Sequence, residues 1–138
     1  MSTFSSMDIS RTGVGMAHHW LENVSHNLAN ANTARATDEE PFRAVRSVVA
    51  ARENGRFADG GSGVATTGQV RQEGDPPLTY DPNHPQADED GMVAMPVMDT
   101  AGQMVDMMLA QRHYQMNARN IETAKEAYES ALRIGSRG

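Results

Sequence analysis

The chain of 138 residues contains no cysteine, so disulfide frameworks, thiol nucleophiles and cysteine-based zinc sites are excluded. Aromatic residues make up only 5% and hydrophobic residues 38% of the sequence, which is less large apolar material than a compact globule would use. No apolar run approaches the roughly 20 residues that a membrane-spanning helix needs. We therefore expect an elongated protein that does not span a membrane.

Basic residues are also scarce, because 12 lysines and arginines stand against 18 aspartates and glutamates and leave a net charge of −6. A nucleic-acid-binding protein needs a basic stripe that displaces counterions from phosphates, so we expect no nucleic-acid partner. The first residues lack the basic start and apolar core of a secretory signal. If the protein works outside the cytosol, we expect it to leave by a route without a cleaved signal.

A long amphipathic helix is predicted from Asp99 to Ile134, with no proline inside it. Thr100 and Gln103 have the spacing of a capping box, and Asp99 is an alternative N-cap. A helix of this length with an apolar stripe needs a partner of matching length. The residues near a three-and-four spacing form one helical stripe or a loose coiled-coil seam: Met104, Met107 or Met108, Gln111, Tyr114, Ala118, Ile121, Lys125, Tyr128 and Leu132.

A second amphipathic helix is predicted at the N-terminal end, capped by Ser6 or Asp8 and ending near Asn30 to Thr33. Its apolar stripe contains Ile9, Gly13, Met16, Trp20, Val24, Asn27 and Ala31. The simplest way to bury the stripes of both helices is to pair them and loop out the middle of the chain.

The middle of the chain is polar and rich in turn-forming residues. An extended run from Pro41 through Val49 and a second one from Gly63 to Arg71 predict two short strands, with Glu53-Asn54-Gly55-Arg56 as a turn signal between them. We therefore predict a mainly α fold with a small β insert. The helices of residues 1–33 and 99–138 pair as a coiled-coil-like hairpin, and residues 34–98 form a β-rich or irregular insert.

Candidate sites for chemistry are few. His18, Glu22 and His26 are four residues apart and could face one way, but zinc would need a further ligand. Asp88 to Gly91 lacks the alternating ligands of a calcium-binding EF-hand loop. Ser62 lacks the strand-to-helix context of a nucleophile elbow. We predict no catalytic, cofactor-binding or metal site. A small periplasmic metal-binding protein or enzyme is the alternative hypothesis, and metal analysis of the purified protein distinguishes the two.

Methionine is abundant, and seven of the ten methionines lie between Met92 and Met116. Methionine is flexible and suits irregular or changing surfaces. In a chain with so little material for a core, this favours a helix face that packs against neighbouring molecules.

One short motif resembles the signature of the bacterial flagellar rod and hook proteins: Asn27-Leu28-Ala29-Asn30-Ala31-Asn32-Thr33, at the end of the predicted N-terminal helix. Further stretches are similar to those of proximal rod members of this family, in the expected order over nearly the whole chain. They are Asn32 to Arg35 with Pro41 to Arg43, Tyr80 to Pro96, Met104 to Met107, Arg112 to Asn117, and Thr123 to Lys125. The stretch Asp81-Pro82-Asn83-His84-Pro85 is the specific one, since all axial proteins share the Asn-rich motif.

The resemblance implies a structural, non-enzymatic subunit of the proximal rod of the flagellar basal body, in the periplasmic space. It implies export by the flagellar type III apparatus, helical assembly around the export channel, and transmission of torque from the membrane ring to the hook. The two end helices would form the inner tube, and the insert would face outward.

The same resemblance implies the partners and the packing surface. The partners would be other copies of the chain and the rod proteins FlgB, FlgF and FlgG, with FliE and the MS ring as further candidates and the export apparatus in transit. Together, the motif and the helical stripe predict ten residues that pack subunits together: Asn27, Asn30, Thr33, Met104, Met107, Met108, Tyr114, Ala118, Ile121 and Tyr128.

Overall fold

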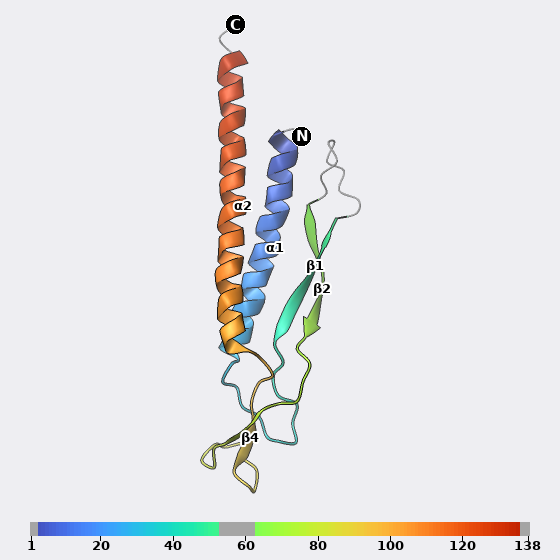
Figure 1. Cartoon of the computed structure of the whole chain (residues 1–138), viewed down its shortest axis with the longest axis vertical. Helices are drawn as coiled ribbons and strands as arrows, with labels where there is room; N and C mark the ends of the chain where they lie inside the picture. The colour runs from blue at the N-terminus through green and yellow to red at the C-terminus, as the bar shows by residue number, and fades with distance from the viewer. Residues whose placement is uncertain (1–2, 53–62, 136–138) are drawn as a thin grey trace.

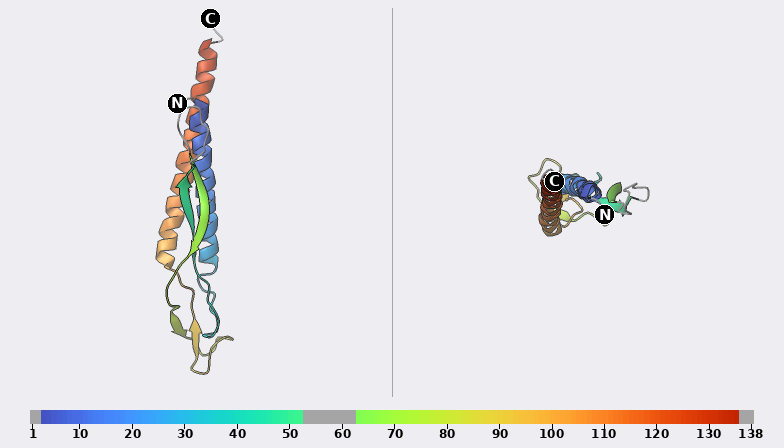
Figure 2. Two further views of the ribbon diagram at one scale, coloured as in Figure 1. Left: turned by 90° about the vertical axis from the view of Figure 1, so that its right-hand side faces the viewer. Right: turned by 90° about the horizontal axis from the view of Figure 1, so that it is seen from above.

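Two long helices and a β-ribbon run side by side in the computed structural model, which describes residues 3–52 and 63–135. The elements in chain order are α1 (Thr3–Ala29), β1 (Val45–Ala51), β2 (Val64–Arg71), β3 (Leu78–Tyr80), β4 (Met92–Ala94) and α2 (Thr100–Gly135). The helices are antiparallel, and α1 lies between α2 and the ribbon of β1 and β2 (Figures 1 and 2). The predicted mainly α fold with paired end helices and a small β insert is confirmed.

Helix α1 begins earlier than the sequence predicts. Ser6 and Asp8 lie within the helix, so the prediction that one of them caps it is wrong. The physical reason is tertiary packing, because Ser5 and Ser10 are buried and such burial extends a helix beyond its local capping signals. The end is close to the predicted one, since Asn30 donates its side-chain amide to the carbonyl oxygen of His26 at 2.9 Å.

Helix α2 has the predicted bounds and runs for 36 residues, a length of about 54 Å. Thr100 is its first residue, so of the two predicted caps Asp99 occupies the N-cap position. The backbone N–H of Gln103 donates to the carbonyl oxygen of Asp99 at 2.9 Å, which closes the first turn. In the part of the chain that the structure describes, no helix is long and apolar enough to cross a membrane.

The two helices bury the α1 stripe better than the α2 stripe. Val24 and Asn27 of α1 are buried as predicted. In α2, however, the buried residues are Ala110 and Ala124, and most of the predicted stripe lies outside the seam. The expectation that pairing buries both stripes is therefore wrong for α2. The reason is that its first half is apolar on nearly every side, so periodicity there does not single out one face.

Strands β1 and β2 correspond to the two predicted strands, and in the structure they pair as an antiparallel ribbon. Val45 pairs with Arg71 and Ala51 with Val64, and the register shifts between Val48 and Val49. The predicted turn at residues 53–56 lies outside the described residues. Most of the ribbon is exposed, and a two-stranded ribbon is only marginally stable alone in water, so it depends on its contacts with α1.

Strands β3 and β4 pair antiparallel at the base of the molecule, with Tyr80 opposite Met92. Neither strand is predicted from the sequence, because three-residue strands among prolines and aspartates have no alternation of polar and apolar residues. Their pairing closes the base together with two bridges, Arg35 to Ala94 and Arg43 to Val97. A small core fills this base, made of Ala44, Val93, Ala94 and Val97.

Candidate assembly surface

The seam between α1 and α2 is lined by small residues. Ser10 and Ala17 of α1 and Ala110 and Ala124 of α2 are all buried. A Cβ atom at Gly13 would stand only 2.5 Å from the side-chain oxygen of Asn117. Glycine at position 13 therefore allows the two helices to approach closely, and the seam needs no large apolar side chain.

The hydrophobic core of the described residues follows the same rule, since its buried members are all alanine or valine: Ala17, Val24, Ala44, Val93, Ala94, Val97, Ala110 and Ala124. Burying an alanine removes much less apolar area from water than burying a leucine or methionine. The packing within one chain thus uses few of the large apolar side chains that the sequence contains.

Most of the exposed large apolar side chains lie on α2 instead. Met104 is 56% exposed, Met108 53% and Met116 61%. Val105 and Leu109 are exposed beside them. We name these five residues the outer face of α2. Contiguous exposed apolar faces are typical of interaction surfaces.

The C-terminal end of α2 extends past α1. Gly13 lies against Asn117 and the Trp20 ring lies 5.9 Å from the His113 ring, so Thr3 is level with about residue 127. Helix α2 continues for about two further turns, as Figure 1 shows. Leu132 is 54% exposed and Ile134 is 77% exposed on this extension, which no other helix among residues 3–52 and 63–135 accompanies.

The predicted packing residues of the Asn-rich motif have different positions in the structure. Asn27 is only 1% exposed and lies inside the chain. Its amide binds Val45 of β1 and Gln103 of α2. Asn30 holds the end of α1 locally, and Thr33 is exposed just beyond it. The structure does not bring these three side chains together at one surface.

The predicted packing residues of α2 divide into two groups. Met104, Met108, Tyr114 and Tyr128 are exposed. Met107, Ala118 and Ile121 are half-buried at the border of the seam. The first group belongs to surfaces open to a neighbour, and the second group borders the contact with α1.

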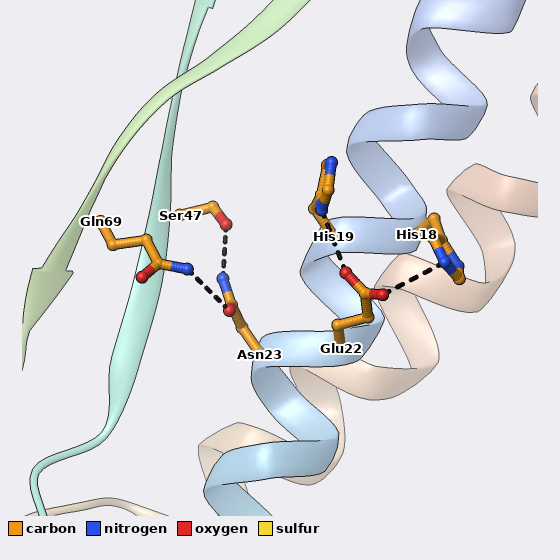
Figure 3. A network of polar contacts seen from close by, with 6 residues as sticks. All are labelled: His18, His19, Glu22, Asn23, Ser47 and Gln69. Carbon is orange, nitrogen blue, oxygen red and sulfur yellow. Dashed lines mark hydrogen bonds and ion pairs between the residues drawn. The ribbon is translucent and has the colours of Figure 1, made fainter.

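His18 and His19 of α1 form a polar cluster with Glu22 (Figure 3), and His26, the third member of the zinc triad weighed from the sequence, is not part of it. Glu22 accepts contacts from His18 at 3.3 Å and from its neighbour His19 at 3.0 Å. The His26 ring lies 5.4 Å from the Phe42 ring. Among residues 3–52 and 63–135, no group of three or more His, Asp or Glu side chains could hold a metal ion.

Asp88 organises the turn between β3 and β4. It accepts hydrogen bonds from the backbone N–H groups of Met92 at 2.8 Å and Asp90 at 3.0 Å, and from the Thr37 hydroxyl at 2.9 Å. The Met92 N–H contributes most to a lowered pKa of the Asp88 carboxyl, partial desolvation opposes it, and Thr37 and Asp90 lower it further. The ring of His84 accepts a hydrogen bond from the backbone N–H of Gln86 at 3.2 Å, so both residues shape the turn.

Comparison with known proteins gives the family. FlgC of Borreliella burgdorferi, a flagellar basal-body rod protein, is 32% identical over 97% of this chain and 98% of its own length. FlgC of Salmonella typhimurium is 32% identical over 98% of this chain and 99% of its own length. The chain belongs to the FlgC family of flagellar basal-body rod proteins. FlgC of Bacillus subtilis is 28% identical over 98% of this chain and 99% of its own length.

A family model described as the C-terminal part of the flagellar basal body rod proteins FlgEFG matches residues 90–134. In this FlgC-family chain that range holds β4, the loop after it and nearly all of α2. The matched range thus contains the outer face of α2.

Sequence reasoning missed several polar residues that join the elements of this FlgC-family chain. Thr12 and Asn23 of α1 bind the ribbon, and Gln103 binds Asn27. The available signal was the four-residue spacing of Asn23 and Asn27 on one side of a helix, which predicts a shared face. That spacing alone does not identify the partner.

Proposed function

We propose that this chain is a structural subunit of the proximal rod of the flagellar basal body. Many copies assemble helically around the export channel, and the assembly carries torque from the membrane ring to the hook. The chain is structural and not enzymatic, as a rod protein family implies. Its place in the cell is accordingly the rod of the basal body, in the periplasmic space.

The observation that carries this proposal is the contrast between the core and the surface. The core of the described chain uses alanine and valine, while Met104, Met108 and Met116 are more than half exposed. Each buried CH₂ group contributes about 0.8 kcal/mol, so the outer face gains substantial free energy when a neighbour covers it. Assembly therefore supplies the burial of large apolar side chains that the isolated chain lacks.

The proposed division of labour follows the elements. Residues 1–33 and 99–138 supply the inner tube through α1 and α2, and residues 34–98 face outward and contact other components. The exposed end of α2 supports contacts along the long axis, because a surface at one end that binds a different surface on the next copy generates an open helical assembly.

The proposed partners are other copies of this chain and the rod proteins FlgB, FlgF and FlgG. FliE and the MS ring are candidates at the base of the rod, and the export apparatus is a partner in transit. The names of the relatives, all flagellar basal-body rod proteins, support rod components as a class.

We propose two roles for the predicted packing residues. The exposed Met104, Met108, Tyr114 and Tyr128 contact neighbouring subunits directly. The half-buried Met107, Ala118 and Ile121, with the motif residues Asn27, Asn30 and Thr33, support that surface from within or at its border.

The experiment is purification of hook–basal bodies from cells that carry a tagged copy of the chain in place of the untagged one. We expect the tagged chain in the rod fraction, and we expect deletion of the gene to abolish both swimming and rod formation. Secretion of flagellar export substrates is the control for an intact export apparatus. Normal rods in the deletion strain would exclude the proposed function.

A further inference from the structure

The ribbon is held to α1 by a row of polar side chains. The backbone N–H of Val64 donates to the Thr12 hydroxyl at 3.0 Å. Farther down α1, Asn23 donates to the Ser47 hydroxyl and accepts from the Gln69 amide at 3.1 Å (Figure 3). These contacts are partly open to solvent, so each one is individually weak.

Asn27 forms the lowest contact in this row and differs from the others in being buried. Its side-chain oxygen accepts from the backbone N–H of Val45 at 2.9 Å, and its side-chain nitrogen donates to the Val45 carbonyl at 2.9 Å. The same nitrogen donates to the side-chain oxygen of Gln103 at 2.8 Å. One amide thus binds the first residue of β1 at two points and also reaches the first turn of α2.

The ribbon has few other means of keeping its position relative to α2. Within residues 3–52 and 63–135, no Cα atom of α2 lies within 8 Å of a Cα atom of β1 or β2. A cavity of about 550 Å³ lies between the ribbon and the first turns of α2, with Ser47, Gln103 and Asp106 in its lining. The Asn27 amide is the point where the buried polar contacts of α1, β1 and α2 meet.

We propose that Asn27 is a positioning residue for assembly, which fixes the angle of the ribbon to the helix pair and thereby the place that the subunit takes in the rod. Asn27 cannot touch a neighbouring subunit, because it is buried within its own chain. It acts through Val45 and the ribbon, whose exposed strands meet the neighbours. This inference rests on the proposed function, since it concerns assembly into the rod.

The chemistry of the site requires an amide at position 27. Val45 presents both a donor and an acceptor, and only a side chain with both groups can satisfy them. Aspartate has nearly the same shape, but its ionised carboxylate has no donor. Asn27→Asp therefore sets an oxygen against the Val45 carbonyl and loses the hydrogen bond to it, while the volume of the side chain is kept. The contact with Gln103 is kept only if the Gln103 amide turns over to donate its nitrogen.

The first experiment measures the ribbon position in the purified chain, which has no cysteine of its own. The pair Asn23→Cys and Ser47→Cys reports the contact of the ribbon with α1, and the pair Gly13→Cys and Asn117→Cys reports the helix pair. We expect Asn27→Asp to slow cross-linking of the ribbon pair by about tenfold and to leave cross-linking of the helix pair unchanged. Asn32→Asp is the matched control, because Asn32 is exposed just beyond α1.

The second experiment is complementation of a strain that lacks the gene. We expect Asn27→Asp to be exported but to leave swimming and rod formation impaired, and Asn32→Asp to swim normally. The ribbon-pair disulfide, formed after export, should restore rods in the Asn27→Asp background, because it holds the ribbon by a covalent bond.

Three results would overturn the inference. The first is normal rod formation with Asn27→Asp. The second is slower cross-linking of both cysteine pairs, which indicates a general loss of folding. The third is a ribbon-pair disulfide that forms in the Asn27→Asp chain but does not restore rods. If the unaltered chain fails to restore rods, the proposed function fails, while the cross-linking comparison still decides how Asn27 holds the ribbon.

Discussion

Asp88 shows how one carboxylate can fix a loop that is poor in apolar residues. Three donors converge on it, from Met92, Asp90 and Thr37, and Thr37 comes from the segment that follows α1. The carboxylate therefore joins the turn before β4 to a distant part of the chain. Its lowered pKa makes the order of this turn depend on pH.

The pH dependence has a definite sign. A carboxyl group whose pKa is lower in the folded chain contributes stability above its unfolded value of 3.8, and this contribution is lost as the pH falls through the folded value. We expect protection of the Met92 amide from hydrogen exchange to be constant from pH 7 to 5 and to fall in acid below 3.8. Asp88→Asn should show low protection at every pH, and Asp81→Asn is the control. Equal protection in Asp88→Asn and the unaltered chain would contradict this role.

Gly13 and Gly15 offer a matched pair on one helix. A Cβ atom at Gly13 would meet Asn117, whereas a Cβ atom at Gly15 would meet nothing within 4 Å. We expect Gly15→Ala to raise the free energy of unfolding by about 1 kcal/mol through helix propensity. Gly13→Leu should lower it by about 1–3 kcal/mol through overpacking.

We expect the effect of a substitution at Gly13 on the free energy of unfolding to depend on the residue at position 117. Gly13→Ala alone should gain less than Gly15→Ala, because the Asn117 side chain must leave its hydrogen bond to the His113 carbonyl at 2.8 Å. Gly13→Ala with Asn117→Ala should recover the full gain, which thermal unfolding of the four chains measures as a double-mutant cycle. Additive effects at the two positions would show that the helices do not meet there.

At the scale of the elements, α1 and α2 use their surfaces differently. Helix α1 is covered on one side by α2 and on another by the ribbon (Figure 2). Helix α2 has only α1 as a helical partner within the described chain, and its outer face keeps five large apolar residues in solvent. Under the proposed function, this asymmetry assigns the assembly surface mainly to α2.

A charge on the outer face should therefore separate folding from assembly. Met108 is 53% exposed, so we expect Met108→Asp to change the free energy of unfolding of the isolated chain by less than about 0.5 kcal/mol. Assembly would bury the new carboxylate without a partner, which is costly, so swimming should be lost although the chain is exported. His84→Asp is the control, because aspartate in that turn can still accept from Gln86. Swimming by the Met108→Asp strain would contradict the assigned surface.

At the scale of the whole molecule, the chain is a rod-shaped subunit with a base and a side arm (Figure 1). The base joins the chain before β1 to the chain after β3, because Arg35 and Ala94 exchange two backbone hydrogen bonds of 2.9 Å. The ribbon leaves this base and follows α1 upward. The ribbon can thus change in sequence while the base and the helix pair keep their contacts.

This arrangement predicts the result of exchanging the ribbon. We expect a chimera that carries residues 46–71 of another rod protein to fold and to be exported, because Val45, the base and the seam are retained. It should fail to take its own place in the rod, since specificity at such polar surfaces depends on shape and charge. Basal bodies from cells lacking the original gene give the measurement, with a chimera of the loop 82–87 for comparison. Full restoration by the ribbon chimera would assign position in the rod to the helices alone.

The sequence by itself determined the two long helices, their pairing and the positions of β1 and β2. These follow from local rules: a helical period sustained without proline, the N-cap at Asp99, and runs rich in valine and threonine bounded by turns. The Asn-rich motif and the Asp-Pro-x-His-Pro stretch also indicated the family. Relatives that match over nearly the full length of the chain confirm it.

Only the tertiary structure decided which residues face inward. Methionines, Val105 and Leu109 lie on several sides of the first half of α2. The seam instead forms at Ala110 and Ala124, where small side chains let α1 approach. Asn27 was predicted on the stripe of α1 that helix pairing buries, but its three hydrogen bonds go to Val45 and Gln103, which are 18 and 76 residues away. Contacts at such separation depend on how the elements dock, and no local pattern of residues contains that information.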